Sequence, residues 1–335
     1  MSYTKQVKAW LQLTRAHTVV LEGPIAVLGA ALSLGTLFDY RVGLWLVFGV
    51  MYHLIGYGMN SYVDWDKGFD KEDERKQHHP LNTGSIEPDK AKKVIGVSFV
   101  LLFVYLFALT YHDLIALGMS VLMVISGVAY NYFGKYTIMK SIPISIAHTL
   151  VFFIPYTLYS DSVGMFGLYV TLAYFVHHFY QIAISGDIKD LDQDEASLIQ
   201  YLGAKVEDGP VSSVKRFSTS PTILIFAYGT SVVEIGLTFV GEYSITPDTA
   251  SIFVTLVFAG LTFYDTDNML QSGAFLRESR LKYISRREFF GYTMIHSLSI
   301  QILGIKQFGL IVLCMLIYLG LVSKFIWGNW LVPDV

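Results

Sequence analysis

The sequence predicts an all-α, polytopic membrane protein with nine transmembrane helices around a central cavity. Three observations lead to this prediction. Hydrophobic residues make up 53% of the 335 positions and charged residues 15%, whereas soluble domains carry about 25% charged residues. The apolar residues fall in runs of roughly 20, the length that crosses a bilayer. The basic residues gather in alternate connecting segments, as they do in proteins that cross a membrane several times.

The apolar runs define the expected spans. They cover roughly residues 17–38, 43–61, 94–112, 114–131, 141–160, 163–185, 220–240, 246–264 and 308–329. Residues 1–16 precede them with apolar and basic side chains interleaved, which indicates an interfacial helix. Residues 284–305 mix apolar and charged side chains, so we expect an interfacial or re-entrant segment there, with a tenth span as the alternative.

The distribution of Lys and Arg predicts the orientation. With nine spans, the N-terminus and the connections after spans 2, 4, 6 and 8 share one side, and this side receives nearly all of the 24 basic residues. The positive-inside rule then predicts a cytoplasmic N-terminus and an outside C-terminus. Two polar loops on the cytoplasmic side, 62–93 and 186–219, follow similar long helices. We therefore expect a single membrane domain over residues 1–335, built from two pseudo-repeated halves.

Composition excludes several functions. A formal net charge of −3 does not favour nucleic acid as a partner. The one cysteine, Cys314, rules out an intramolecular disulfide and a zinc–thiolate cluster.

The first polar loop opens with an acidic cluster. Asn60 and Asp64 are four residues apart and share a helix face. The pair Lys67-Gly68 is expected to end the helix and let Asp70 fold back toward that face. Asp66 lies one step away from this face and is the weaker candidate ligand.

The second polar loop carries a similar cluster. Asp187, Asp190 and Asp194 are spaced three and four apart and share a face if helical, whereas Asp192 does not. Clustered carboxylates next to hydrocarbon are costly unless a cation neutralises them. Oxygen ligands with room for phosphate suit Mg²⁺, so the two clusters are expected to bind Mg²⁺ and a diphosphate across one cavity. For any single Asp, plain solvation is the alternative.

Basic and polar residues near the clusters complete the predicted site. Lys76 and Lys189 are the first candidates to hold the diphosphate, followed by Lys135 and Lys140, for which a purely topogenic role is the alternative. Tyr130 and Asn131, at the end of the fourth span, are candidate diphosphate contacts or interfacial anchors.

Two ionisable residues inside the spans are candidates for acceptor binding. Glu234 lies within span 7, where a charge is a functional hypothesis by default; a neutral, hydrogen-bonded carboxyl is the alternative. His53 is expected either to orient an acceptor or to bond a neighbouring helix. For His177 and His178, packing is the favoured interpretation.

These motifs resemble those of the UbiA superfamily of intramembrane prenyltransferases. The family carries an NxxxDxxxD-type motif after helix 2 and a DxxxD-type motif after helix 6, and the resemblance covers essentially the whole chain. The first motif here, with Lys67-Gly68 before Asp70, is similar to that of the menaquinone-type branch, the 1,4-dihydroxy-2-naphthoate prenyltransferases. The downstream Pro-Leu-x-x-Gly frame is kept, but His79 replaces the usual arginine. The stretch after Asp194 also departs from that branch.

The resemblance implies Mg²⁺-dependent transfer of an isoprenyl group from a polyprenyl diphosphate to an aromatic quinone precursor or another hydrophobic or lipid acceptor. The diphosphate would ionise to give an allyl cation that the acceptor attacks. A UbiA-type terpene cyclase or carotenoid-extending enzyme is the second hypothesis. A divalent-cation or solute transporter is the third.

Overall fold

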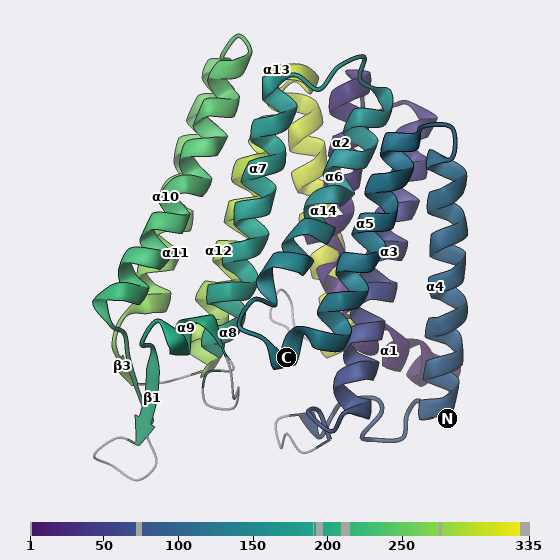
Figure 1. Cartoon of the computed structure of the whole chain (residues 1–335), viewed down its shortest axis with the longest axis vertical. Coiled ribbons are helices and arrows are strands. Elements are labelled where there is room, and N and C mark those ends of the chain that lie inside the picture. Colours follow the sequence, from purple (N-terminus) through teal and green to yellow (C-terminus); the bar gives the residue numbers. More distant parts are fainter. Residues whose placement is uncertain are drawn as a thin grey trace. The chain divides into compact units, whose positions relative to one another are not determined.

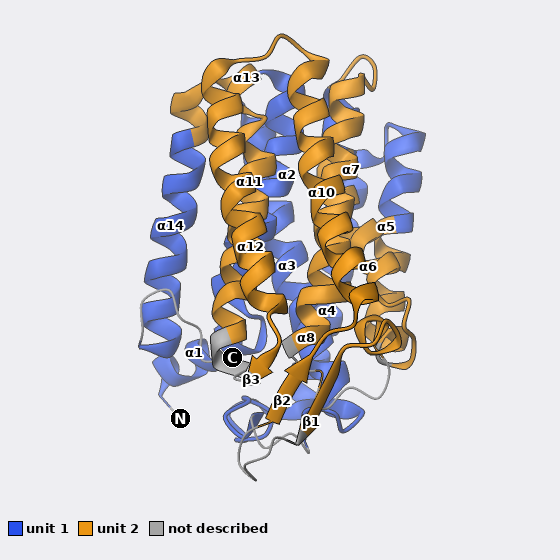
Figure 2. Ribbon diagram, turned by 90° about the vertical axis from the view of Figure 1, so that its left-hand side faces the viewer, with its two compact units in different colours: residues 1–122, 154–159, 309–335 blue, residues 123–153, 160–308 orange. Residues whose placement is uncertain are grey.

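The computed structural model describes residues 2–71, 76–189, 191, 197–208, 215–274 and 277–328. Its helices and strands appear in Figure 1. The chain forms two compact units, which Figure 2 colours separately. Unit 1 comprises residues 1–122, 154–159 and 309–335, and unit 2 comprises residues 123–153 and 160–308.

Unit 1 contains the N-terminal helices and the last helix. Its elements are α1 (Tyr3–Leu13), the 3₁₀ turn η1 (Ala16–Thr18), α2 (Val19–Leu34), α3 (Tyr40–Asp66), α4 (Pro88–Thr110), the first part of α5 (Leu114–Phe133) and most of α14 (Ile305–Trp327). Helices α2 and α3 pack closely, because Gly49 leaves room for the Gly23 backbone: a Cβ at Gly49 would lie 2.9 Å from the Gly23 carbonyl oxygen.

Unit 2 contains the remaining helices and a small sheet. Its elements are the end of α5, η3 (Gly134–Tyr136), most of α6 (Ser141–Tyr159), α7 (Met165–Tyr180), the π-helix η4 (Gln181–Gly186), α8 (Asp187–Lys189), α9 (Leu198–Tyr201), β1 (Lys205–Asp208), β2 (Lys215–Ser218), α10 (Pro221–Ser244), α11 (Thr249–Leu270), β3 (Gly273–Ala274), α12 (Arg277–Ser297) and α13 (Ile300–Leu303).

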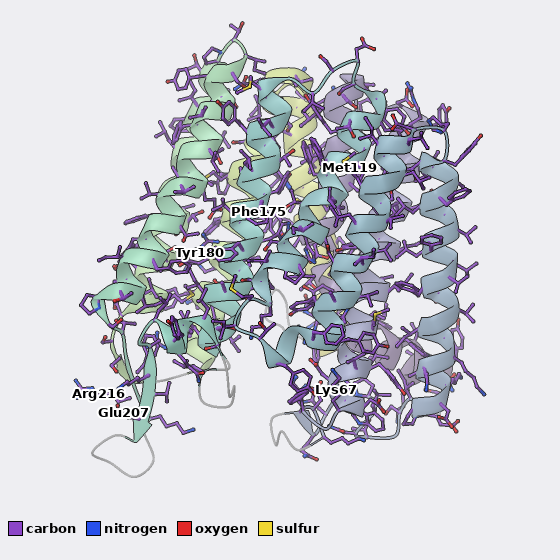
Figure 3. All side chains as sticks on the ribbon, viewed as in Figure 1. Lys67, Met119, Phe175, Tyr180, Glu207 and Arg216 are labelled. Carbon is purple, nitrogen blue, oxygen red and sulfur yellow. The ribbon has the colours of Figure 1, made fainter. Side chains whose placement is uncertain are left out.

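The sheet was not anticipated from the sequence. Strands β1, β2 and β3 pair antiparallel in that order, with Glu207 opposite Arg216. Figure 3 shows both side chains on this sheet, together with Phe175 and Tyr180 on α7. Phe217 of β2 is buried in an apolar cluster that includes Tyr180, which joins the sheet to the helices of unit 2.

The prediction of a polytopic helical membrane protein is confirmed. Within the described residues, eight helices are long and apolar enough to cross a bilayer, and they correspond to eight of the nine predicted spans. The remaining predicted span, 163–185, is the continuous helical run of α7 and η4. Two helices extend past the predicted limits: α3 continues to Asp66 and α4 begins at Pro88, so the first polar loop is shorter than expected.

The expectation of an interfacial segment at 284–305 is wrong for most of that range. Helix α12 has 21 residues, about 32 Å of helix, and lies along α11 and against α7 (Figure 2). Residues 291–300 are all buried. Arg287, one of the charged residues that suggested a position at the membrane surface, is fully buried and forms an ion pair with Glu234. The alternative of a tenth spanning segment fits this helix.

The prediction that the two termini lie on opposite sides is also wrong. Within unit 1, the Tyr318 hydroxyl of α14 donates to the carbonyl of Ala16 at 3.0 Å. The Trp327 ring, at the end of α14, contacts His17 and also His78 of the first polar loop. Helix α14 therefore ends where α2 begins. The long helix α12, which was not counted among the predicted spans, lies between α11 and α14 in the chain.

Candidate active site

The first acidic cluster is built by the end of α3. The helix ends at Asp66, and Gly68 takes a left-handed φ of 95°, which a residue with a side chain rarely adopts. The chain then reverses, and the Asp70 amide donates to the Asp64 carbonyl at 3.3 Å. The predicted helix break at Lys67-Gly68 and the return of Asp70 are confirmed.

Two carboxylates of this cluster are buried at the polar end of the helix. Asp64 and Asp70 are 5% and 4% exposed. The Lys76 ammonium donates to Asp70 Oδ1 at 2.6 Å. Asn60 is half-buried, whereas Asp66 is exposed. The structure thus brings together Asp64, Asp70 and Lys76 and leaves Asp66 outside.

The loop after Asp70 is fixed by Asn82. Its amide nitrogen donates to the carbonyls of Asp70 and Lys76, at 2.9 and 2.8 Å, and its oxygen accepts from Trp65 Nε1 at 2.9 Å. Asn82 belongs to the Pro-Leu-x-x-Gly frame but was not singled out from the sequence. Its two donated bonds hold the backbone of the Lys76–Asp70 pair.

His79 lies beside the same carboxylate. Its Nε2 is 4.0 Å from Asp70 Oδ2, and its Nδ1 accepts from the Leu81 amide at 3.4 Å. Burial lowers the pKa of His79 from 6.5 to about 4; the Asp70 carboxylate opposes this shift and Lys76 adds to it. At neutral pH the ring is uncharged, with its proton on Nε2 facing Asp70. An arginine at this position would be charged at every physiological pH.

The second acidic cluster begins where α7 and the π-helix end. Asp187 is 1% exposed, and Lys140, which precedes α6, places its ammonium 2.6 Å from Asp187 Oδ1. Asp190, Asp192 and Asp194 lie outside the described residues, as do the side chains of Lys189 and Lys135. The structure therefore joins two of the residues predicted for this cluster.

Tyr130 and Asn131 lie near the end of α5, and Tyr130 is close to Lys140. A Cβ at Gly134 would lie 3.3 Å from the Tyr130 ring and 3.6 Å from Lys140 Cβ, so Gly134 brings the two side chains close together. Asn131 is buried and donates to the Gly127 carbonyl at 3.0 Å, while its side-chain oxygen has no hydrogen-bond partner in the part of the chain that the structure describes. That oxygen is available to a donor group.

The two intramembrane candidates are bonded to neighbouring helices. His53 Nδ1 lies 2.7 Å from Glu22 Oε2, and its Nε2 lies 3.2 Å from both the Thr18 hydroxyl and the Arg15 carbonyl. Of the two interpretations of His53, the bond to a neighbouring helix is the observed one. Glu234 is fully buried and paired with His177 and Arg287. Arg287 was missed because it lies in the segment that was expected to be interfacial.

The chemistry of the donor set fits Mg²⁺. Each cluster offers buried carboxylate oxygens at the end of an apolar helix, and Asp70 and Asp187 each lie beside one lysine. The described part of the chain holds no group of three or more His, Cys, Asp or Glu side chains arranged around one point. Such a group is not required, because Mg²⁺ is commonly held by one or two carboxylates together with waters and substrate phosphates.

The fold and the paired acidic clusters define an intramembrane transferase. The chain belongs to the UbiA prenyltransferase family, whose pattern matches residues 23–209. Solved structures of similar fold include a digeranylgeranylglyceryl phosphate synthase, at 17% identity and a TM-score of 0.64, with 90% of this chain and 99% of that one covered. A UbiA homologue from Aeropyrum pernix K1 has 15% identity and a TM-score of 0.60, with 88% and 97% covered.

A further similar structure is a UbiA homologue from Archaeoglobus fulgidus bound to DMAPP and Mg²⁺. It has 15% identity and a TM-score of 0.58, with 88% of this chain and 99% of that one covered. No curated protein matches the chain. Membership of a transferase family sets the transporter hypothesis aside.

Proposed function

We propose that this protein transfers an isoprenyl group from a polyprenyl diphosphate to a hydrophobic acceptor in a Mg²⁺-dependent reaction. The observation that carries the proposal is the paired arrangement of buried carboxylate and lysine: Asp70 with Lys76, and Asp187 with Lys140, each 2.6 Å apart. The family homologue bound to DMAPP and Mg²⁺ supports the choice of donor and metal.

The residues divide into two sets. Asp64 and Asp70, with Asn60 beside them, would hold one Mg²⁺, and Asp187 with Asp190 and Asp194 would hold another. Bound Mg²⁺ neutralises charge on the phosphate oxygens and so helps the diphosphate leave. Asp66 is left out of the first set because it is exposed.

The lysines and the hydrogen-bond donors would act on the negative charge of the leaving diphosphate. Lys76 and Lys140 would turn toward the diphosphate and stabilise the negative charge that develops as the C–O bond breaks, with Lys189 and Lys135 as further cations. The neutral His79 would donate from Nε2. The allyl cation left behind is attacked at C1 by the electron-rich acceptor, which then loses a proton.

For the acceptor, we propose an aromatic quinone precursor of the 1,4-dihydroxy-2-naphthoate type. The support is the Lys67-Gly68 spacing, which produces the left-handed turn at Gly68 and returns Asp70 to Asp64. We further propose that residues 1–335 act as a single membrane domain with the acidic clusters on the cytoplasmic side, because each unit carries one cluster and the loops 62–93 and 186–219, which hold the clusters, are rich in basic residues.

The test uses purified protein in lipid nanodiscs, labelled geranylgeranyl diphosphate, Mg²⁺ and one acceptor at a time: 1,4-dihydroxy-2-naphthoate, 4-hydroxybenzoate or an isoprenyl glyceryl phosphate. We expect a prenylated naphthoate and Mg²⁺-dependent diphosphate release. Product with another acceptor would correct the branch. Diphosphate release with a prenyl hydrocarbon and no acceptor product would support the cyclase hypothesis. The absence of Mg²⁺-dependent release with donors of every chain length would overturn the proposal.

A further inference from the structure

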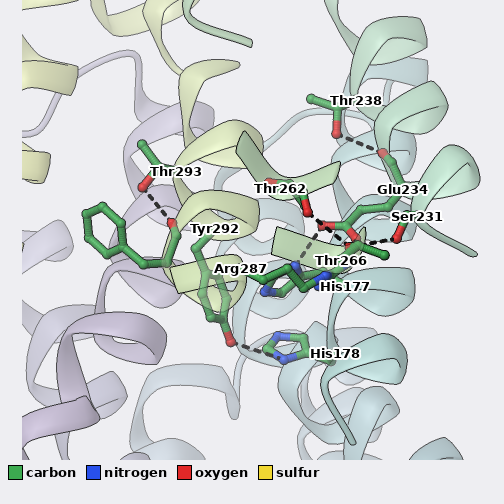
Figure 4. Close-up of polar contacts among 11 residues, drawn as sticks. His177, His178, Ser231, Glu234, Thr238, Thr262, Thr266, Arg287, Tyr292 and Thr293 are labelled. Atoms are coloured by element: carbon green, nitrogen blue, oxygen red, sulfur yellow. Dashed lines mark hydrogen bonds and ion pairs between the residues drawn. The ribbon is translucent and has the colours of Figure 1, made fainter. Parts of the chain in front are cut away.

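A buried ionic cluster lies inside unit 2, about three helical turns before Asp187. Figure 4 shows Glu234 of α10 between His177 of α7 and Arg287 of α12. The His177 Nδ1 donates to Glu234 Oε1 at 2.7 Å, and Arg287 Nη2 donates to Glu234 Oε2. All three side chains are fully buried. We call these three residues the ionic triad.

Stability alone does not account for the ionic triad. Removing a carboxylate and a guanidinium from water is costly, and apolar side chains of similar volume usually give an equal or greater stability. The cost is higher because Arg287 has unused donors: among the described residues, its Nε and Nη1 have no hydrogen-bond partner. Buried ionic groups of this kind can instead fix a specific geometry, so the question is which geometry the ionic triad fixes.

The ionic triad and its neighbours on α12 pack against the last turn of α7. The Arg287 guanidinium lies over the Tyr180 ring, 3.4 Å from its centre, and Tyr180 is three residues after His177 on the same helix. Gly291, one turn after Arg287, leaves space for the imidazole, because a Cβ there would overlap the His177 ring and come within 2.9 Å of Glu234 Oε1. The face of α12 is thus shaped to hold both His177 and Tyr180.

Helix α7 gives way to a π-helix immediately after Tyr180. Residues Gln181–Gly186 form a π-helix, which is rarer and less favourable than an α-helix and frequently marks functional sites. Gly186 suits the wide turn, since a Cβ would lie 3.1 Å from the Gln181 carbonyl oxygen. The next residue is Asp187, held by Lys140 at 2.6 Å. The π-helix therefore lies between the ionic triad on one side and the Asp187–Lys140 pair on the other.

We propose that Glu234, His177 and Arg287 are positioning residues that keep the π-helix in place and thereby set the direction of Asp187. If the last turn of α7 were released, the π-helix could relax to an α-helix. Each residue of an α-helix turns by about 100°, so a change of register by one residue would rotate Asp187 away from Lys140. The inference rests on the proposed function, because it assigns Asp187 to metal binding.

The experiment measures metal binding without substrate. Mn²⁺, which takes the same oxygen ligands as Mg²⁺, is titrated by electron paramagnetic resonance into nanodiscs that hold the full chain. Asp64→Asn and Asp187→Asn assign the binding classes to the two acidic clusters. The test variant is Glu234→Met with Arg287→Met, which removes both charges together and leaves neither one buried alone. Thr238→Val, a buried position one turn along α10 from Glu234, is the matched control.

We expect the double variant to keep a thermal midpoint close to that of the unmodified protein. Its Mn²⁺ class assigned to Asp187 should weaken by about tenfold or more, as when the groups that support a metal ligand are lost. The class assigned to Asp64 should be unchanged, and Thr238→Val should retain both. Unchanged affinity in both classes of the double variant would overturn the inference.

Two single variants keep the test decisive if the double variant does not fold. His177→Leu removes one donor to Glu234 and should weaken the Asp187 class, whereas His177→Asn, whose amide nitrogen can take the place of Nδ1, should restore it. Equal affinity in the two His177 variants would contradict a positioning role. If the unmodified protein binds no Mn²⁺ in either class even when inorganic diphosphate is added, the proposed metal-dependent function itself fails, and this outcome is distinct from the others.

Discussion

The two acidic clusters contain the same kind of aspartate–lysine pair but are built from different elements. In each, an apolar helix ends at a buried aspartate with a lysine ammonium 2.6 Å away. In the first cluster the lysine, Lys76, is six residues from Asp70, and a turn at Gly68 returns Asp70 to Asp64. In the second cluster Lys140 comes from the start of an earlier helix, and Asp187 follows a π-helix. The first cluster is a local structure, whereas the second depends on contacts between distant segments.

The largest expected effect comes from removing a carboxylate charge in either cluster. Asp64→Asn and Asp187→Asn should each lower kcat by about 10²- to 10³-fold, the range seen when one group that stabilises developing charge is lost. Diphosphate release in nanodiscs measures the rate. Asp66→Asn is the matched control and should stay close to normal, because Asp66 is exposed. Near-normal rates for Asp64→Asn or Asp187→Asn would show that the cluster concerned does not take part.

Replacing the lysine of each cluster should lower the thermal stability of the protein by different amounts. The Lys140 side chain is 11% exposed and its partner Asp187 2%, whereas Lys76 is 30% exposed. Breaking a buried pair costs about 3 kcal/mol or more, and a pair whose lysine reaches solvent, as Lys76 does, costs less to break because water screens the charge. Lys140→Met should therefore lower the thermal midpoint of metal-free protein clearly more than Lys76→Met. Equal shifts would indicate that the second cluster is no more dependent on its ion pair than the first.

The difference between local and distant contacts also decided what the sequence could predict. The helix break at Lys67-Gly68 and the return of Asp70 follow from spacing and from glycine alone, and both are observed. The pairing of Lys140 with Asp187 required knowledge of which helices are neighbours, so both residues were candidates without a partner.

The largest error has the same origin. Arg287 and Glu234 are far apart in the chain, and a charge in an apolar segment predicts an interface until its buried partner is known. Helix α12 was therefore placed at the membrane surface, and α14 was expected to end away from the start of α2. His177 and Glu234, both ionisable and within predicted spans, were the signal that a buried cation had to lie nearby.

The two glycines that border the clusters allow a smaller contrast. Gly68→Ala forces a side chain into a left-handed backbone at φ 95°, which costs about 1–2 kcal/mol. At Gly186 the added Cβ would lie 3.1 Å from the Gln181 carbonyl, its one close neighbour among the described residues, and the backbone is not left-handed. Thermal midpoints should fall more for Gly68→Ala. A larger fall for Gly186→Ala would mean that the π-helix tolerates less distortion than the turn at Gly68.

The smallest expected effect is a pH dependence that belongs to the first cluster. Burial lowers the pKa of His79 from 6.5 to about 4 in the folded protein. As the pH falls from 6.5 to about 4, the unfolded chain takes up a proton at His79 and the folded chain does not, so stability falls across this window, by at most about 1.4 kcal/mol per pH unit. Above pH 6.5 the residue contributes no slope, and below about pH 4 the loss is complete.

The measurement compares thermal midpoints of the unmodified protein and His79→Gln between pH 7.5 and 4, without metal. Glutamine keeps a hydrogen-bond donor near Asp70 but cannot take up a proton, so the variant should show a shallower fall in midpoint below pH 6.5. The other histidines are present in both proteins, and their contributions cancel in the difference. Parallel curves would mean that His79 is protonated in the folded state as readily as in the unfolded one, and that it faces Asp70 as a cation in the manner of the arginine it replaces.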